Sequence, residues 1–167
     1  MEVLMPNYVM NNIQSFSLER VLEGIVIWVL HADKIPPHIG ISINGLFFSL
    51  KANGKDIAVP IENVLDVINR REITLLCFSL SDVLSEKRVA DSFELYDKTI
   101  PNKITCLNPI KNILKHDRPT KLVELLSLLE EEGRIINVFG LNILNDFSGI
   151  KDYDVADIHE RLTLLNK

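Results

Sequence analysis

The sequence predicts an α+β protein in which helices pack on an antiparallel β-sheet. Hydrophobic residues make up 47% and charged residues 25% of the chain, with 7 Gly and 7 Pro, which is typical of a globular domain. Asn44-Gly45 lies between two runs of alternating apolar residues and predicts a β-hairpin. Segments of helical periodicity alternate with short apolar runs elsewhere. The length of 167 residues suits one domain, so we expect 1–167 to fold as a unit.

The first third of the chain is expected to hold most of the sheet. "SLERVLEG" predicts a short helix with Ser17 as its candidate cap. The segment 24–30 is apolar on both faces, which predicts a central strand. The hairpin strands are expected at 38–43 and 46–51, and a turn at Asn53-Gly54 precedes a short strand at 56–59.

Helices and further strands are expected to alternate over the rest of the chain. Pro60 opens a helix of about three turns, and the β-rich run 72–80 follows it. Ser85 precedes a helix that ends near residue 97. The remaining elements are a helix from 108 to about 116, a helix capped by Thr120 and ended by Gly133, a strand at 134–139 and a final amphipathic helix.

The hairpin places one histidine, His38, on a semi-polar face. Pairing across Asn44-Gly45 sets Gly40 opposite Ser49 and leaves Ile39 on an apolar core face. The other face carries His38, Gly40, Ser42, Phe47, Ser49 and Lys51. Gly40 has no side chain, so a ligand can approach beside His38. Ser49 lies diagonally from His38 and could hold the imidazole in one tautomer, which leaves the other nitrogen as a base. The alternative is an edge histidine with no chemical role.

The two cysteines, Cys77 and Cys106, lie in different settings. Cys77 is within the apolar run "EITLLCFSL" and is expected to be a buried thiol. Cys106 is just before a predicted helix, where the helix dipole and free N–H groups favour a thiolate. The same N–H groups could stabilise an oxyanion. The alternative for Cys106 is a small apolar residue that fills space under a loop.

The segment "HIGISINGLFFSL" resembles the histidine hairpin of the papain-like NlpC superfamily. His38 matches the catalytic histidine, Gly40 the small residue after it, and Ser49 the third, orienting residue on the returning strand. In the circularly permuted branch, which includes the lecithin:retinol acyltransferase-like proteins, the nucleophilic cysteine follows the histidine at the start of a helix. "SEKRVADSFELYDKTIPNKITCLNPIKNIL" has that layout, and Cys106 matches the nucleophile. The resemblance covers about residues 24 to 116.

The resemblance implies a permuted papain-like core and a thiol hydrolase or acyltransferase that acts on an amide or ester. Cys106 would attack the carbonyl, His38 would carry the proton, and Ser49 would orient His38. No metal or organic cofactor is implied. The third position is usually His, Asn or Gln in active members, so an inactive binding or interaction protein with the same fold is the alternative. A third possibility is an unrelated α+β domain whose hairpin matches by chance.

Charge and apolar patterning restrict the partners and the location. The net charge of −5 and the lack of a basic cluster argue against a nucleic-acid partner. The longest apolar run, 24–30, is too short to span a bilayer, and no signal peptide begins the chain, so we expect a cytoplasmic protein. The four histidines lack metal-ligand spacing. The sequence leaves the substrate, which would be a peptide, lipid or protein amide or ester, and the oligomeric state open.

Overall fold

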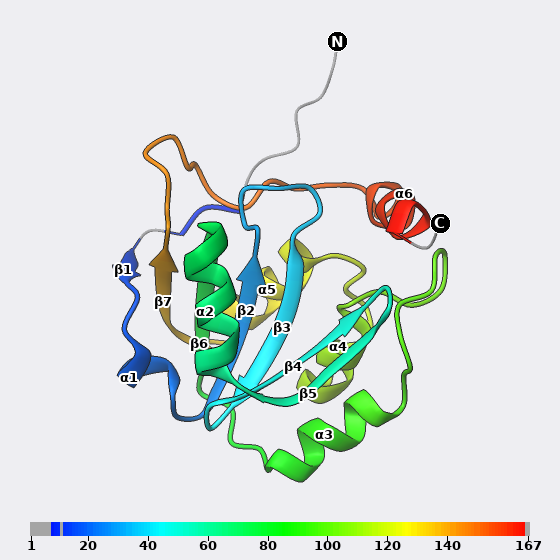
Figure 1. Ribbon diagram of the computed structural model, residues 1–167, viewed down its shortest axis with the longest axis horizontal. Helices are drawn as coiled ribbons and strands as arrows, with labels where there is room; N and C mark the ends of the chain where they lie inside the picture. The colour runs from blue at the N-terminus through cyan, green and yellow to red at the C-terminus, as the bar shows by residue number, and fades with distance from the viewer. Residues whose placement is uncertain (1–7, 11, 166–167) are drawn as a thin grey trace.

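The computed structural model describes residues 8–10 and 12–165 and has an α+β fold built on one seven-stranded sheet. The strands are β1 (Ile13–Ser15), β2 (Ile25–Leu30), β3 (His38–Ile43), β4 (Leu46–Lys51), β5 (Gly54–Pro60), β6 (Leu75–Leu80) and β7 (Ile135–Leu141). The helices found in the described residues are α1 (Leu18–Val21), α2 (Ile61–Arg71), α3 (Glu86–Glu94), α4 (Asn108–Leu114), α5 (Leu122–Glu131) and α6 (Val155–Leu165). Figure 1 shows α2 on one side of the sheet and α4 and α5 on the other.

The sheet is mixed, and most of its pairs are antiparallel. The strand order is β1-β7-β6-β2-β3-β4-β5, and only β1 with β7 is parallel among the described strands. The prediction of an antiparallel sheet with packed helices is therefore confirmed except at this edge. Sequence reasoning missed β1, because three residues without a buried side chain carry too little periodicity to stand out. The strand β2 lies between β3 and β6, as its apolar character on both faces predicts.

The hairpin of β3 and β4 has the predicted register. Gly40 pairs with Ser49, and Ile43 pairs with Leu46. Asn44 and Gly45 both adopt positive φ, at 48° and 81°, which is the backbone geometry that a two-residue hairpin needs. Asn44 also ties the turn to the start of β2, since its side-chain oxygen accepts from the N–H of Gly24 at 3.0 Å. The turn is thus fixed both locally and by its neighbour.

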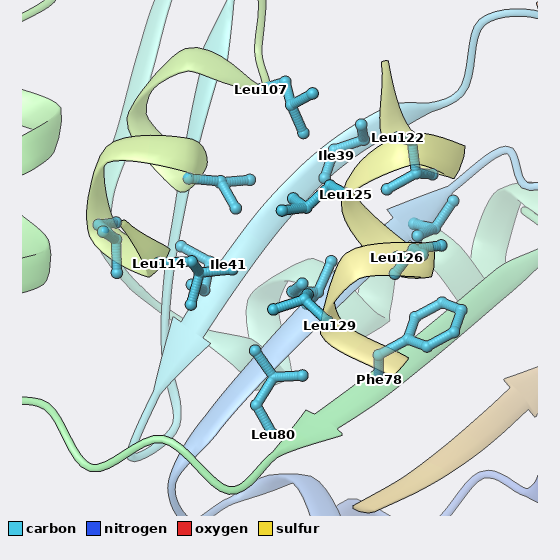
Figure 2. Packing of buried hydrophobic residues seen from close by; sticks show 14 of the residues in the cluster. Ile39, Ile41, Phe78, Leu80, Leu107, Leu114, Leu122, Leu125, Leu126 and Leu129 are labelled. Atoms are coloured by element: carbon cyan, nitrogen blue, oxygen red, sulfur yellow. The ribbon is translucent and has the colours of Figure 1, made fainter. Parts of the chain in front are cut away.

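The main hydrophobic core lies between the sheet and α3, α4 and α5. Ile39 and Ile41 of β3 and Phe78 of β6 meet the leucines of α5 there, and all of these side chains are buried (Figure 2). Leu107, which precedes α4, is also buried in this core. Alternate residues of β3 therefore anchor the strand in the core, as the pattern predicts.

The opposite face of the hairpin is a second core. The indole N–H of Trp28 donates to Ser42 Oγ at 2.8 Å, and Trp28 also meets the Phe47 ring edge-on. Residues of α2 cover this cluster, which includes Phe47 and Ile61. The Phe47 ring occupies the space beside Gly40. The prediction of an open, semi-polar face at Gly40 is wrong here, because a neighbouring aromatic ring fills the position.

Helix starts agree with the sequence in part. Ser85 caps α3, since its Oγ accepts from the N–H of Arg88 at 3.1 Å. Ser17 precedes α1 but makes no capping hydrogen bond with its side chain. Pro60 ends β5 and α2 begins one residue later. Thr120 lies before the start of α5, and its hydroxyl donates to Glu124.

Across the described residues, no helix has both the length and the apolar character to cross a membrane.

Substituting Gly40→Ala is expected to destabilise the fold. An added Cβ would overlap the Phe47 ring, and overpacking of this kind costs about 1–3 kcal/mol of unfolding free energy. Chemical denaturation of the wild type, Gly40→Ala, Phe47→Leu and the double variant measures the coupling. The double variant should lose less than the sum of the two single variants. Additive losses would show that Phe47 does not occupy the space beside Gly40.

Candidate functional site

A cavity of about 660 Å³ lies at the end of the sheet where β3 begins and β4 ends. Residues from both faces of the hairpin reach it, among them His38 and Lys51 from one face and Ile39 and Leu50 from the other. Cys106 and Leu107 form part of its wall, and α6 contributes Ile158 and Leu162. The two predicted residues His38 and Cys106, far apart in the chain, therefore line one cavity.

His38 is the first residue of β3 and is partly buried. Burial lowers its pKa to about 4, because a charged imidazolium is poorly solvated there. The Asp56 carboxylate opposes this effect and raises the pKa, whereas Lys51 and His31 lower it further. His38 is accordingly a neutral imidazole at physiological pH, which is the protonation state that a general base requires.

Ser49 is fully buried and bonds to an acidic residue that sequence reasoning missed. Its hydroxyl donates to Asp56 Oδ2 at 2.8 Å, and Lys51 Nζ donates to Asp56 Oδ1 at 3.0 Å. No hydrogen bond joins Ser49 to His38 in the described part of the chain. The role of Ser49 in orienting His38 therefore stays a prediction. Asp56 supplies the negative charge near His38 instead.

The position of Asp56 follows from the turn between β4 and β5. Lys51 pairs with Gly54 across Ala52-Asn53, which sets Ser49 opposite Asp56. The sequence predicts this turn one residue later, at Asn53-Gly54, a register in which the two side chains do not pair. A β-bulge between the Phe47 and Ser49 pairs shifts the register further along β5. The prediction of a turn between these two strands is confirmed, but its position is wrong by one residue.

Cys106 lies in a turn two residues before α4 and is partly exposed. The buried side chain of Leu107 holds this turn in the main core, beside Ile39 (Figure 2). The backbone N–H of Ile39 acts on the sulfur and lowers the Cys106 pKa, but burial outweighs this effect and raises the pKa. Cys106 is therefore a thiol at neutral pH, rather than the thiolate that the helix position predicts.

The backbone N–H groups around Cys106 are only partly available for an oxyanion. Leu107 N–H donates to Thr105 Oγ1 at 3.2 Å, and Asn108 N–H donates to the Thr105 carbonyl at 3.1 Å. The Asn108 side chain bonds back to the Thr105 N–H at 2.8 Å, which closes the turn. The N–H groups of Cys106 and Ile39 are the two that act on the sulfur. These two are the remaining candidates for the predicted oxyanion hole.

Tyr153 is a further residue that the sequence did not single out. It is buried, lines the cavity, and its phenolic oxygen accepts from the N–H of Leu122 at 3.3 Å. Burial raises its pKa above the ordinary range, and the nearby Cys106 adds to this effect when its thiol is ionised. The bond from Leu122 leaves the phenolic proton free to donate. Nothing in the irregular segment around Tyr153 marks it as a site residue.

Cys77 lies elsewhere and is fully buried in β6, as predicted. Burial raises its pKa well above the ordinary value, so it stays a protonated thiol at neutral pH. Within residues 8–10 and 12–165, no three His, Cys, Asp or Glu side chains are grouped so that they could hold a metal ion. The cavity residues are thus the candidate site.

Comparison with known proteins found no matching family model, no similar curated protein and no similar solved structure.

The low pKa of His38 predicts a pH dependence of stability. In the unfolded chain the imidazole titrates near 6.5, whereas in the folded protein it titrates near 4, so the unfolded state binds more protons between these values. The resulting stabilisation is complete above pH 6.5 and is lost as the pH falls to 4, by about 3 kcal/mol at 1.36 kcal/mol for each unit of pKa shift. Urea denaturation at several pH values measures it.

The variant His38→Asn isolates this contribution from other titrating groups. Its unfolding free energy should fall less than that of the wild type between pH 6.5 and 4. His31→Asn, which changes an exposed histidine of the same cavity, is the matched control. It should differ from the wild type only by the contribution of His31 to the low His38 pKa, which is the smallest of the named causes. Equal pH dependence in the wild type and His38→Asn would contradict the burial of a neutral His38.

Proposed function

We propose that this protein is a thiol hydrolase or acyltransferase with a permuted papain-like core, and that it acts on an amide or ester bond. Cys106 is the nucleophile and His38 is the general base. The observation that carries the proposal is that His38 and Cys106, far apart in the chain, line the same cavity, where the Ile39 N–H is close enough to the sulfur to lower the Cys106 pKa. The order of the elements, with a histidine hairpin, then a helix, then the cysteine turn, supports the permuted arrangement.

The proposed reaction has two halves. The Cys106 sulfur forms a bond to the carbonyl carbon while His38 accepts the thiol proton, and the carbonyl oxygen becomes an oxyanion. The carbon–nitrogen or carbon–oxygen bond then breaks, and His38 returns the proton to the leaving amine or alcohol. A water molecule, or an acceptor alcohol or amine, attacks the thioester with His38 again as base. The carbon–sulfur bond breaks and the thiol is restored.

Both reacting groups start neutral in this scheme. Burial lowers the pKa of His38 to about 4 and raises the pKa of Cys106, so both shifts disfavour the ion pair. Proton transfer therefore accompanies attack on the carbonyl, and the N–H groups of Ile39 and Cys106 stabilise the negative charge as it forms. The Asp56 carboxylate favours the imidazolium that results.

The second candidate is a binding protein with the same fold and no chemistry. The observation in its favour is that Ser49 bonds to Asp56, so the third residue of the family pattern is not engaged with His38. In this case the cavity holds a ligand and the thiol is inert. The two functions differ in whether the reactivity of Cys106 depends on His38.

The proposal predicts that His38 accelerates alkylation of Cys106 at low pH. A thiol with a raised pKa is almost entirely protonated at pH 6, so without a base it reacts very slowly with iodoacetamide. We expect His38→Asn to reduce the rate at pH 6 by about a hundredfold, the lower end of what a positioned base contributes. Mass spectrometry of the alkylated peptides against time measures the rate.

Two residues serve as controls for this experiment. Cys77 is fully buried in the native protein and should remain unmodified. His31→Asn removes a histidine that lines the same cavity and should leave the Cys106 rate within about twofold, since the exposed ring of His31 is not the proposed base. A Cys106 rate that rises only with thiolate formation, and that His38→Asn does not change, would favour the binding protein.

A further inference from the structure

The charged residues that line the cavity all carry positive charge. They are Lys34, Lys51, Lys121 and Arg161, and no Asp or Glu is among the described residues of the wall. The chain as a whole has a net charge of −5, so its composition does not explain a cationic wall. A concave, partly apolar surface with positive charge favours anionic ligands.

Arg161 is the cation without an acidic partner. The three lysines each pair with an aspartate that lies outside the wall: Lys34 with Asp33 at 3.9 Å, Lys51 with Asp56 at 3.0 Å, and Lys121 with Asp152 at 2.8 Å. No ion pair involves Arg161 within the described part of the chain, and its residue is exposed. Its guanidinium is therefore available to a carboxylate or phosphate.

Thr99 carries a buried hydroxyl that no other described residue bonds. It lines the cavity and is 2% exposed, yet its hydroxyl oxygen has no hydrogen-bond partner among the described residues. Its N–H donates to the Lys51 carbonyl at 2.9 Å, which fixes the residue beside the end of β4. A buried hydroxyl without a partner is unfavourable, and such groups in native proteins need an explanation. The hydroxyl oxygen is itself covered in the free protein, so a ligand oxygen in the cavity would satisfy it once the Thr99 side chain turns toward the cavity.

Thr99 and Arg161 belong to neighbouring segments. His159 Nδ1 of α6 accepts from the Asn102 N–H at 2.7 Å, and this bond holds α6 beside the loop that carries Thr99. The rest of the wall is largely apolar and includes Ile35, Leu50 and Leu165. The cavity thus combines polar recognition at one pair of segments with space for an apolar group.

We propose that the cavity at Cys106 binds a substrate that joins a carboxylate or phosphate to an apolar segment, with Thr99 and Arg161 recognising the anionic group. This inference rests on the proposed function, because it names the substrate class of that site. In this arrangement the Thr99 hydroxyl donates to an anionic oxygen and Arg161 neutralises its charge. Both are positioning residues and take no part in proton transfer.

Calorimetric titration of the wild type with four eight-carbon probes tests the anion preference. Octanoate and octyl phosphate carry the proposed anionic groups, and octanol and octylamine are the neutral and cationic controls. We expect at least one anion to bind about tenfold more tightly than octanol, and octylamine to bind most weakly. The stronger of the two anions identifies the group. The affinity of the anions should fall with added salt.

The variants Thr99→Val and Thr74→Val separate recognition from structure. Both threonines are buried, but Thr74 Oγ1 already donates to the Asn142 carbonyl at 3.2 Å. Thr99→Val should reduce anion affinity about tenfold and leave the melting temperature of the free protein unchanged or higher, because it removes an unpaired hydroxyl. Thr74→Val should lower the melting temperature and leave anion affinity unchanged.

Arg161→Gln should weaken anion binding about threefold to fivefold, as expected for one exposed charge, and leave octanol binding unchanged. Arg70→Gln, on α2 away from the cavity, is its matched control. Equal affinity for octanoate, octyl phosphate and octanol would overturn the proposal, as would a Thr99→Val variant with full anion affinity.

The binding titrations and the alkylation experiment together separate the anion site from the thiol chemistry. Anion binding without His38-dependent alkylation would retain the anion site and overturn the thiol chemistry. His38-dependent alkylation without an anion preference would overturn this inference alone.

Discussion

The register of the β3–β4 hairpin is the constraint on which the site depends. Side chains alternate between the two faces of a sheet, so a slip of one residue would exchange the core face of β3 with the opposite face. Asn44 and Gly45 prevent this slip through their positive φ angles and through the bonds between Asn44 and Gly24. With the register fixed, Ile39 is buried in the main core and His38 begins the strand at the cavity.

The same constraint determines where Cys106 lies. Leu107 is buried with Ile39 in the main core, so the turn before α4 is held against the start of β3. The sulfur then lies within reach of the Ile39 N–H. Burial has a chemical consequence, because it raises the pKa of Cys106 and lowers that of His38. The packing that brings the two residues to one cavity also keeps both of them neutral.

The parts of the fold that the sequence predicts are those with a strong local signal. The Asn-Gly turn specifies both strands of the hairpin and their pairing, and the apolar run of β2 specifies a central strand. Cys77 follows the same rule, since an apolar run predicts its burial. Residues whose roles depend on distant packing could not be found this way. Asp56 needed the exact turn of β4 and β5, and Tyr153 lies in an irregular segment.

Two site expectations differ from the structure for physical reasons. Gly40 was expected to leave room for a ligand, but the Phe47 ring fills that room as part of the core under α2. Cys106 was expected to be acidic because of its place before a helix. The helix α4 has only seven residues, and the loss of solvation on burial dominates. Local patterns do not report either the rotamer of a neighbour or the depth of burial.

The reaction of the protein with p-nitrophenyl acetate tests whether Cys106 and His38 act as nucleophile and base. If Cys106 and His38 act as nucleophile and base, the wild type should release one equivalent of p-nitrophenolate in a burst and carry an acetyl group on Cys106 by mass spectrometry. Cys106→Ala should show no burst, and His38→Asn should show a slower one. Release of p-nitrophenolate at the same rate from the wild type and Cys106→Ala, with no acetyl group on Cys106, would contradict the role of Cys106 as nucleophile.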